Sequence, residues 1–235
     1  MENPLSAEPL FHIGPVPIAE PVLVTWALMA VLVGLSARAT RRLSVHPGKA
    51  QALLELVVTT LDAQIRDTMN RDPAPFRALI GGIFLYVLLA NWMSLVPGLE
   101  PPTAHVETDA ALALIVFAAT VYHGITGRGL KGYLATFAEP SWVMIPLNLV
   151  EQITRTFSLI VRLFGNVMSG VFIVGIVLAL AGLFVPIPLM ALELLTGAVQ
   201  AYIFAILATV FIGAAVGDDA DRPSIDTPDT QDPPP

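Results

Sequence analysis

Cysteine is absent from this 235-residue sequence, which excludes disulfides, thiolate metal sites and a cysteine nucleophile. Charge is also scarce, because Asp, Glu, Lys and Arg together make up only 13% of the residues. An average soluble domain carries about 25% charged residues, so this composition could not form a water-facing surface. The sequence also lacks a G-x-x-x-x-G-K-[ST] loop, which would hold nucleotide phosphates. We expect no cofactor, no metal site and no nucleic-acid partner.

Hydrophobic residues make up 55% of the chain, and its mean hydropathy is +0.72. A hydrocarbon core about 30 Å thick needs about 20 apolar residues as a helix. The stretch from Trp142 to Val216 is too long for one crossing, and Gly182, Pro186 and Pro188 interrupt it, which indicates a long helical hairpin. We predict an all-α integral membrane protein with five transmembrane helices, at residues 22–37, 78–96, 110–126, 142–181 and 187–217.

Residues 49–70 follow a different pattern from these spans. Leu53, Leu56, Leu61 and Ile65 recur at helical spacing, while charged residues occupy the other faces. This pattern predicts an amphipathic helix that lies on the cytoplasmic surface of the membrane instead of crossing it. Together with the five spans it belongs to a single predicted membrane domain, residues 1–217.

The two ends of the chain differ from its middle. Residues 1–21 contain no Lys or Arg, unlike the basic start of a signal peptide, and their prolines indicate an irregular external arm. Residues 218–235 contain six acidic residues and little that could be buried. We therefore predict that they form a disordered, acidic, proline-rich tail on the cytoplasmic side.

Lysine and arginine are distributed unevenly among the connections between the spans. Residues 1–21, 97–109 and 182–188 contain none, whereas residues 38–77 contain seven and residues 127–132 contain two. Cytoplasmic loops are the ones enriched in Lys and Arg. The distribution therefore predicts an N-terminus outside the cell and a cytoplasmic C-terminus; in a bacterial inner membrane the outside is the periplasm.

Arg162 stands inside the fourth predicted span, with a long apolar stretch after it. An arginine at the centre of a membrane helix costs about 2.5–3.5 kcal/mol on insertion scales, so it must face a cavity, a counter-charge or a partner. The functional interpretation is an ion path, and Ser158 and Asn166 share its helix face at i−4 and i+4. The alternative is a salt bridge to Glu151 or Glu193 that only locks the helices together.

The last predicted span carries a second polar stripe. Glu193 and Gln200 are seven residues apart and share one helix face with Gly197. A hairpin in which Arg162 met Gln200 would turn near Gly182, where a break is available. Two facing polar stripes favour an ion path, although a simple hydrogen bond between helices would also account for Gln200.

These residues resemble a known family. The segment RLFGN at 162–166, preceded by a helix that starts near Pro146, is similar to subunit a of the bacterial F-type rotary ATP synthases. The final helix LTGAVQAYIFAILATVFIGAAV, the segments NWMSLVPG and PPTAHVETDAALAL, and the arm FHIGPVPI fit the same family. The resemblance covers residues 11–217, which is everything except the tail.

The resemblance implies an ion-translocating stator subunit in the bacterial inner membrane, without an ATP site of its own. Arg162 would face a ring of c subunits near their essential carboxylates and would separate two aqueous half-channels. Gln200 and Asn166 match the glutamine and asparagine of the family, and Glu193 falls in the half-channel that opens outside. The implied partners are the c-ring, the b-type peripheral stalk subunits and the lipid bilayer, within a multisubunit complex.

The sequence departs from the family at several positions. Val171 follows Gly170 where some members have a glutamate, and Glu193 on the facing helix could supply that carboxylate. Asn148 replaces a frequent glutamate, which makes Glu151 the cytoplasmic candidate, with Arg155 as its partner at i+4 or as an anchor at the membrane surface. Three external residues are candidates for the outer entrance, but an ordinary wet loop explains them more simply: His105, Glu107 and Asp109.

Two further functions remain open from the sequence. A self-contained secondary antiporter would use Arg162 and Glu193, but such proteins usually have inverted repeats and more spans. A structural membrane anchor would use the charges as locks between helices. The sequence leaves open whether the coupling ion is H⁺ or Na⁺.

Overall fold

The structure is a computed structural model, and it describes residues 9–13, 16–40, 48–95, 100–138, 141–182 and 184–217. Within these residues, five helical segments are long and apolar enough to cross a membrane. The prediction of an all-α membrane protein with five spans and a hairpin of the last two is confirmed. The α-helices are α1 (Glu20–Thr40), α2 (Lys49–Met69), α3 (Ala74–Trp92), α4 (Val106–Phe137), α5 (Ile145–Ala181) and α6 (Ile187–Val216). Short 3₁₀ turns are η1 (Met93–Leu95), η2 (Pro102–Ala104) and η3 (Trp142–Met144).

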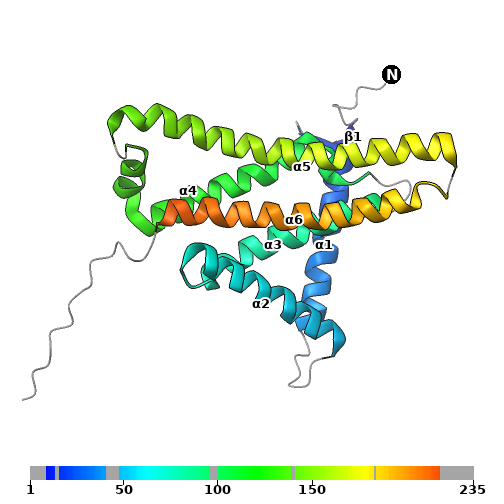
Figure 1. Cartoon of the computed structure of the whole chain (residues 1–235), viewed down its shortest axis with the longest axis horizontal. Coiled ribbons are helices and arrows are strands. Elements are labelled where there is room, and N and C mark those ends of the chain that lie inside the picture. The colour runs from blue at the N-terminus through cyan, green and yellow to red at the C-terminus, as the bar shows by residue number, and fades with distance from the viewer. Residues whose placement is uncertain are drawn as a thin grey trace, which may run out of the picture.

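Helices α5 and α6 form a long antiparallel hairpin (Figure 1). Gly182 ends α5 with φ 75°, a conformation that side chains larger than glycine disfavour, and Pro188 lies in the first turn of α6. With 37 residues, α5 is about 55 Å long at 1.5 Å per residue. Because the hydrocarbon core is only about 30 Å thick, α5 must either tilt strongly or extend beyond it.

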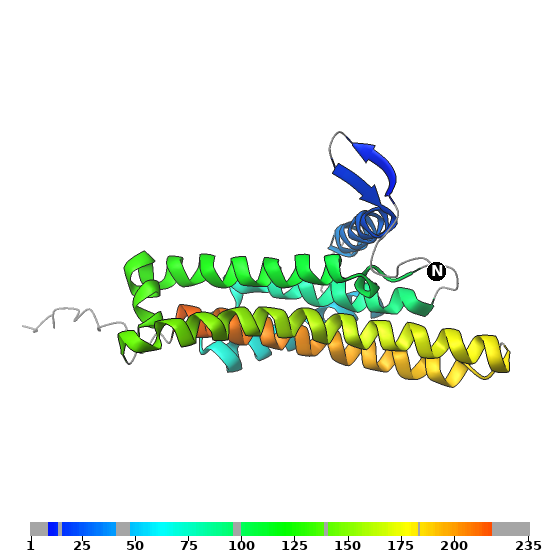
Figure 2. The same ribbon diagram turned by 90° about the horizontal axis from the view of Figure 1, so that it is seen from above.

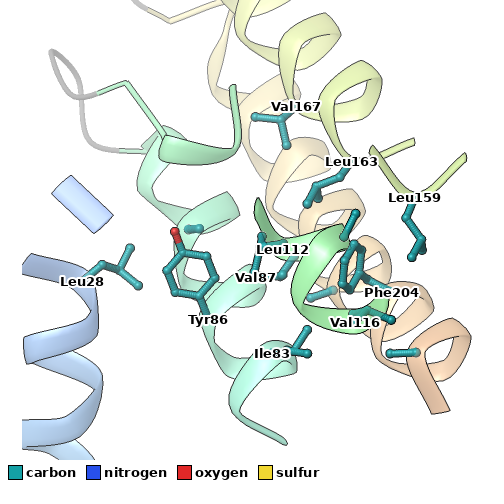
Figure 3. Packing of buried hydrophobic residues seen from close by; sticks show 14 of the residues in the cluster. Leu28, Ile83, Tyr86, Val87, Leu112, Val116, Leu159, Leu163, Val167 and Phe204 are labelled. Carbon is teal, nitrogen blue, oxygen red and sulfur yellow. The ribbon is translucent and has the colours of Figure 1, made fainter. Parts of the chain in front are cut away.

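Helix α6 lies at the centre of the bundle and contacts α2, α3, α4 and α5. In Figure 2, α1 stands to one side of the bundle, where it packs mainly against α3. A buried core joins α1, α3, α4, α5 and α6, and Figure 3 shows its side chains around Phe204 of α6. The described backbone is almost entirely helical because a helix satisfies its own polar groups in lipid.

The amphipathic helix α2 uses only part of its length for packing. Ile65 and Met69 are buried against α3 and α6, whereas Leu53 and Leu56 in its first half are exposed. The bidentate hydrogen bonds from Arg77 to Asp62 tie α2 to α3, with distances of 2.6 and 2.5 Å. The exposed leucines leave an apolar strip that a membrane surface could cover, as the amphipathic pattern predicts.

The N-terminal arm is more regular than expected. Strands β1 (Pro9–Ile13) and β2 (Val16–Ala19) pair as an antiparallel hairpin directly before α1, where an irregular segment was predicted. The strand pairing could not be predicted from the sequence, because Pro alternates with apolar residues here and proline is usually a signal against strands. The predicted acidic tail, residues 218–235, lies outside the described residues.

Helix α4 changes direction at Gly129, where φ is 74° and ψ is 162°. The break comes shortly after the predicted end of the third span, and a short helical segment leads on to Phe137. Beside it, two arginines hold the end of α6: Arg71 Nε donates to Gly217 O at 3.0 Å and Arg128 Nε donates to Val216 O at 3.1 Å. Cations at a helix C-terminus complement the helix dipole, so these bonds fix α6 at this end of the bundle.

Candidate functional site

Arg162 lies on the outer side of α5 and is exposed. Its neighbours on this face include exposed apolar side chains, Phe157 and Val161. Arg162 makes no hydrogen bond or ion pair within the part of the chain that the structure describes. Only 11% of the most apolar stretch around α5 is buried, compared with 44% for α6, so this chain leaves the α5 face largely uncovered.

The alternative interpretation was a salt bridge from Arg162 to Glu151 or Glu193. Among the described residues Arg162 forms neither salt bridge, so this alternative is wrong. Glu151 pairs with Arg155, four residues along α5, as one of the two predicted roles of Arg155 requires. The guanidinium of Arg155 also lies over the ring of Phe211, at 5.5 Å from its centroid. Glu193 Oε1 has no hydrogen-bond partner within the part of the chain that the structure describes. Neither carboxylate that could have neutralised Arg162 does so.

A cavity of about 570 Å³ extends along α5 from Leu147 to Arg162. Ser158 lies in it between the Glu151–Arg155 pair and Arg162, and Leu207 and Phe211 of α6 form its far wall. The predicted grouping of Ser158 with Arg162 therefore holds in space. We name this space the N-side cavity, because it follows the N-terminal half of α5.

A neighbouring cavity of about 310 Å³ adds the remaining cytoplasmic candidate, Asn148. It is lined by Glu151 and Arg155 as well, so it adjoins the N-side cavity. Asn148 Nδ2 donates to Phe137 O at 2.8 Å, which anchors the start of α5 to the end of α4. Asn148 and Glu151 therefore line the same cavity.

A third cavity, of about 170 Å³, lies between the C-terminal half of α5 and the first half of α6. It contains Asn166 and Glu193 together, the two site residues that sequence reasoning placed on facing helices. We name it the C-side cavity. It shares no lining residue with the N-side cavity, and along α5 the change from one to the other falls between Arg162 and Asn166.

Gly170 makes room for the carboxyl group in the C-side cavity. A Cβ atom on Gly170 would lie 2.5 Å from Glu193 Oε1 and 2.9 Å from Glu193 Cδ. The Glu193 carboxyl group of α6 thus lies in the space beside Gly170, one residue before Val171. This geometry agrees with the expectation from Val171.

Gln200 makes no hydrogen bond to Arg162. Gln200 is 7% exposed and its Nε2 atom has no hydrogen-bond partner among the described residues, whereas Arg162 is exposed. Helix α6 is surrounded by four helices and Gln200 is buried among them, while α5 leaves more of its surface uncovered. The two polar stripes share a cavity at Asn166 and Glu193.

The three external candidates have different surroundings. Glu107 is exposed, and His105 Nε2 lies 3.4 Å from Glu100 Oε2. Both observations agree with the interpretation of these two residues as part of a hydrated loop. Asp109 is different, because its exposed fraction is 0% and neither carboxyl oxygen has a hydrogen-bond partner among the residues that the structure describes. The interpretation of Asp109 as a wet loop residue is therefore wrong. Burying a carboxyl group without a hydrogen-bond partner is costly, so Asp109 is not an ordinary loop residue.

Sequence reasoning missed several polar residues of the C-side cavity. Asn91 of α3, Ser169 of α5 and Thr196 of α6 line it with Glu193. Asn91 stands in an otherwise apolar span, and a lone polar residue there was the available signal. Ser169 and Thr196 bond their own helix backbones, which the sequence does not reveal.

Two cavities thus follow each other along α5, and the change from one to the other comes directly after Arg162, which has no ion pair among the described residues. Over residues 22–213 the chain matches the family described as "ATP synthase A chain". The chain belongs to this family. It is 58% identical over 215 residues to "ATP synthase subunit a 2" of Bradyrhizobium sp. (strain BTAi1 / ATCC BAA-1182), a match that covers 92% of this chain and 96% of that protein.

Other ATP synthase A chain relatives are similarly complete. The chain is 47% identical over 196 residues to "ATP synthase subunit a" of Albidiferax ferrireducens, covering 83% of this chain and 85% of that protein. It is 44% identical over 208 residues to "ATP synthase subunit a 1" of Prosthecochloris aestuarii, covering 88% and 93%. The family resemblance that began with RLFGN is confirmed, and the chain is a multi-pass membrane subunit of an ATP synthase.

Proposed function

We propose that this chain is the ion-translocating stator of its ATP synthase, with the two cavities as the protein-lined parts of two half-channels and Arg162 as the barrier between them. The observation that carries this proposal is the position of Arg162. The N-side cavity ends at Arg162 and the C-side cavity begins at Asn166, without a shared lining residue. An ion would have to leave this chain to pass from one to the other.

The missing connection is a ring of c subunits against the exposed face of α5. Arg162 has no counter-charge among the described residues, and an arginine in lipid needs one. A carboxylate on each ring subunit would supply it in turn. The guanidinium is always charged, so it favours the ionised carboxylate as each subunit passes and blocks direct leakage between the half-channels.

The orientation follows the basic residues. Arg71 and Arg128 bind the C-terminal end of α6, at the same end of the bundle as Asn148. By the positive-inside rule this end is cytoplasmic, so the N-side cavity opens to the cytoplasm and the C-side cavity to the periplasm. The N-terminus is then periplasmic and the C-terminus cytoplasmic, in the bacterial inner membrane.

Within this arrangement Glu193 relays or orders the ion in the periplasmic half-channel, and Asn166 shares that cavity. Ser158, Asn148 and Glu151 line the cytoplasmic route. The b-type peripheral stalk subunits hold the chain still against the ring, and nucleotide chemistry takes place in other subunits. The coupled ion is H⁺ or Na⁺.

Replacing Arg162 tests the proposal. We expect Arg162→Ala to abolish ATP-driven ion uptake into inverted membrane vesicles while the complex still assembles with its c-ring. Arg66→Ala, an exposed arginine on α2, is the matched control and should pump normally. Retained pumping in Arg162→Ala would refute the stator role. Ion exchange by the isolated chain in liposomes would instead support the antiporter alternative.

A further inference from the structure

Two consecutive residues at the end of α3 bind the backbone of α6 beside the C-side cavity. Asn91 Nδ2 donates to Gly197 O at 3.1 Å, and Trp92 Nε1 donates to Leu194 O at 3.1 Å. The two acceptors are three residues apart, so they lie about one turn apart on α6. Both lie within four residues of Glu193, which makes this the attachment point of the helix that carries the carboxyl group.

The Asn91 side chain has one fixed orientation. Its exposed fraction is 4%, and its Oδ1 atom accepts a hydrogen bond from Thr103 Oγ1 at 2.9 Å. Thr103 belongs to η2 and is completely buried. Because the amide oxygen already binds the hydroxyl group, the amide NH₂ group must point to Gly197 O. Asn91 therefore connects three elements, α3, η2 and α6, through both ends of one amide.

Gly197 allows the Asn91 side chain to lie close to the backbone of α6. A Cβ atom there would lie 3.0 Å from Asn91 Cβ, so a larger residue would push α3 and α6 apart. Gly197 is also four residues after Glu193, so both residues lie on one face of α6. The same contact that seats Asn91 on Gly197 thus sets the rotation of α6 at Glu193.

We propose that Asn91 is a positioning residue that holds the Glu193 carboxyl group in the C-side cavity. Neighbouring residues of a helix point about 100° apart, so even a small rotation of α6 would turn Glu193 toward the α5 backbone or out of the cavity. Asn91 lines the same cavity, and its hydrogen bond to Gly197 O opposes that rotation. This role rests on the proposed periplasmic half-channel and names the residue that shapes it.

The absence of native cysteine allows a direct test of position. In the assembled complex, a Glu193→Cys variant is reacted with the small water-soluble reagent methanethiosulfonate-ethylammonium from the periplasmic side. Thiols that remain free are then counted with a fluorescent maleimide after denaturation. We expect Asn91→Leu, which keeps the number and branching of the side-chain heavy atoms but removes both hydrogen bonds, to slow the reaction of the introduced thiol about fivefold or more.

Trp92→Phe is the matched control, because it removes only the exposed hydrogen bond to the same helix. We expect it to change the reaction rate less than twofold. Equal slowing by Trp92→Phe and Asn91→Leu would overturn the specific role of Asn91 in favour of general attachment of α3 to α6. An unchanged rate in Asn91→Leu would overturn it as well.

A pair of changes at Thr103 separates positioning from packing and serves also if Asn91→Leu fails to assemble. Thr103→Val keeps the shape and removes the hydroxyl group, whereas Thr103→Ser keeps the hydroxyl group and removes a methyl group. We expect slowed labelling in Thr103→Val and a nearly normal rate in Thr103→Ser. The reverse order would show that packing alone matters and would overturn the proposal.

The labelling measurement needs no pumping, so it is independent of the Arg162→Ala experiment. Loss of pumping in Arg162→Ala with normal labelling in Asn91→Leu would refute only the positioning role. Normal pumping in Arg162→Ala with slowed labelling in Asn91→Leu would refute the stator role and leave the structural role of Asn91 intact.

Discussion

Replacing Gly170 by alanine should impair ion translocation without destabilising the protein. The added Cβ atom would lie 2.5 Å from Glu193 Oε1, 2.9 Å from Cδ and 3.2 Å from Cγ. Favourable contacts between heavy atoms begin at about 3.5 Å, so the carboxyl group must move by about 1 Å. The new methyl group thus occupies the place where the structure holds the carboxyl oxygen.

The effects on stability nearly cancel. Alanine is favoured over glycine in a helix interior by about 1 kcal/mol. Displacing the Glu193 side chain from its rotamer costs about 0.5–1.5 kcal/mol. We therefore expect the free energy of unfolding to change by less than about 1 kcal/mol. A misplacement of about 1 Å in a reacting group can nevertheless cost about 100-fold in rate.

The assay compares ATP-driven ion uptake in inverted vesicles with the amount of assembled complex. We expect uptake per complex to fall by about 10- to 100-fold in Gly170→Ala, with normal assembly and thermal stability. Gly175→Ala is the matched control on the same helix, because nothing lies within 4 Å of a Cβ atom there. It should keep normal uptake.

Normal uptake in Gly170→Ala would refute the reasoning, since it would show that the position of the Glu193 carboxyl group is not critical. Loss of assembled complex would refute the stability argument. If Gly170→Ala and Gly175→Ala reduce uptake equally, the effect belongs to α5 as a whole and not to the contact with Glu193.

Three further changes have separate outcomes. Gly197→Ala brings a Cβ atom to 3.0 Å from Asn91 Cβ, so we expect a loss of about 1–3 kcal/mol in thermal-unfolding measurements of the detergent-solubilised complex. Arg128→Gln removes the hydrogen bond to Val216 O and should cost about 1–2 kcal/mol in the same measurement; an unchanged melting temperature would contradict this. Asp109→Asn should not lower the melting temperature, because the buried carboxyl oxygens have no partners to lose, but it should lower ion uptake; full uptake would exclude Asp109 from the translocation path.

Much of the fold could be predicted from the sequence because it depends on local properties. Apolar runs of sufficient length define the five spans, and Gly182 marks the hairpin turn at the position where the apolar run is interrupted. Arg162 could be singled out as a candidate for the same reason, since a charge inside such a run is costly wherever the helix lies. The pairing of Arg155 with Glu151 could also be predicted, because residues four apart lie on the same face of a helix.

The rest of the site depends on distant parts of the chain. Asp109 is at the start of α4, where sequence alone suggests water, and only the packed structure leaves it with an exposed fraction of 0%. Asn91 gains its importance from Thr103 and Gly197, which are 12 and 106 residues away along the chain. The burial of Gln200 without a hydrogen bond to Arg162 could not be predicted, because helical spacing places residues on a face but does not say which neighbour that face meets.

The sequence by itself determined the class of protein, the five spans, the hairpin and the costly arginine, because hydrophobicity and charge act on each segment independently of its neighbours. The tertiary structure alone decided the rotation of each helix within the bundle. That rotation brings Glu193 into the cavity beside Gly170, buries Gln200 and leaves Arg162 exposed on α5. It follows from the sum of many contacts between helices, such as the close approach of Asn91 to Gly197, and no single segment contains that information.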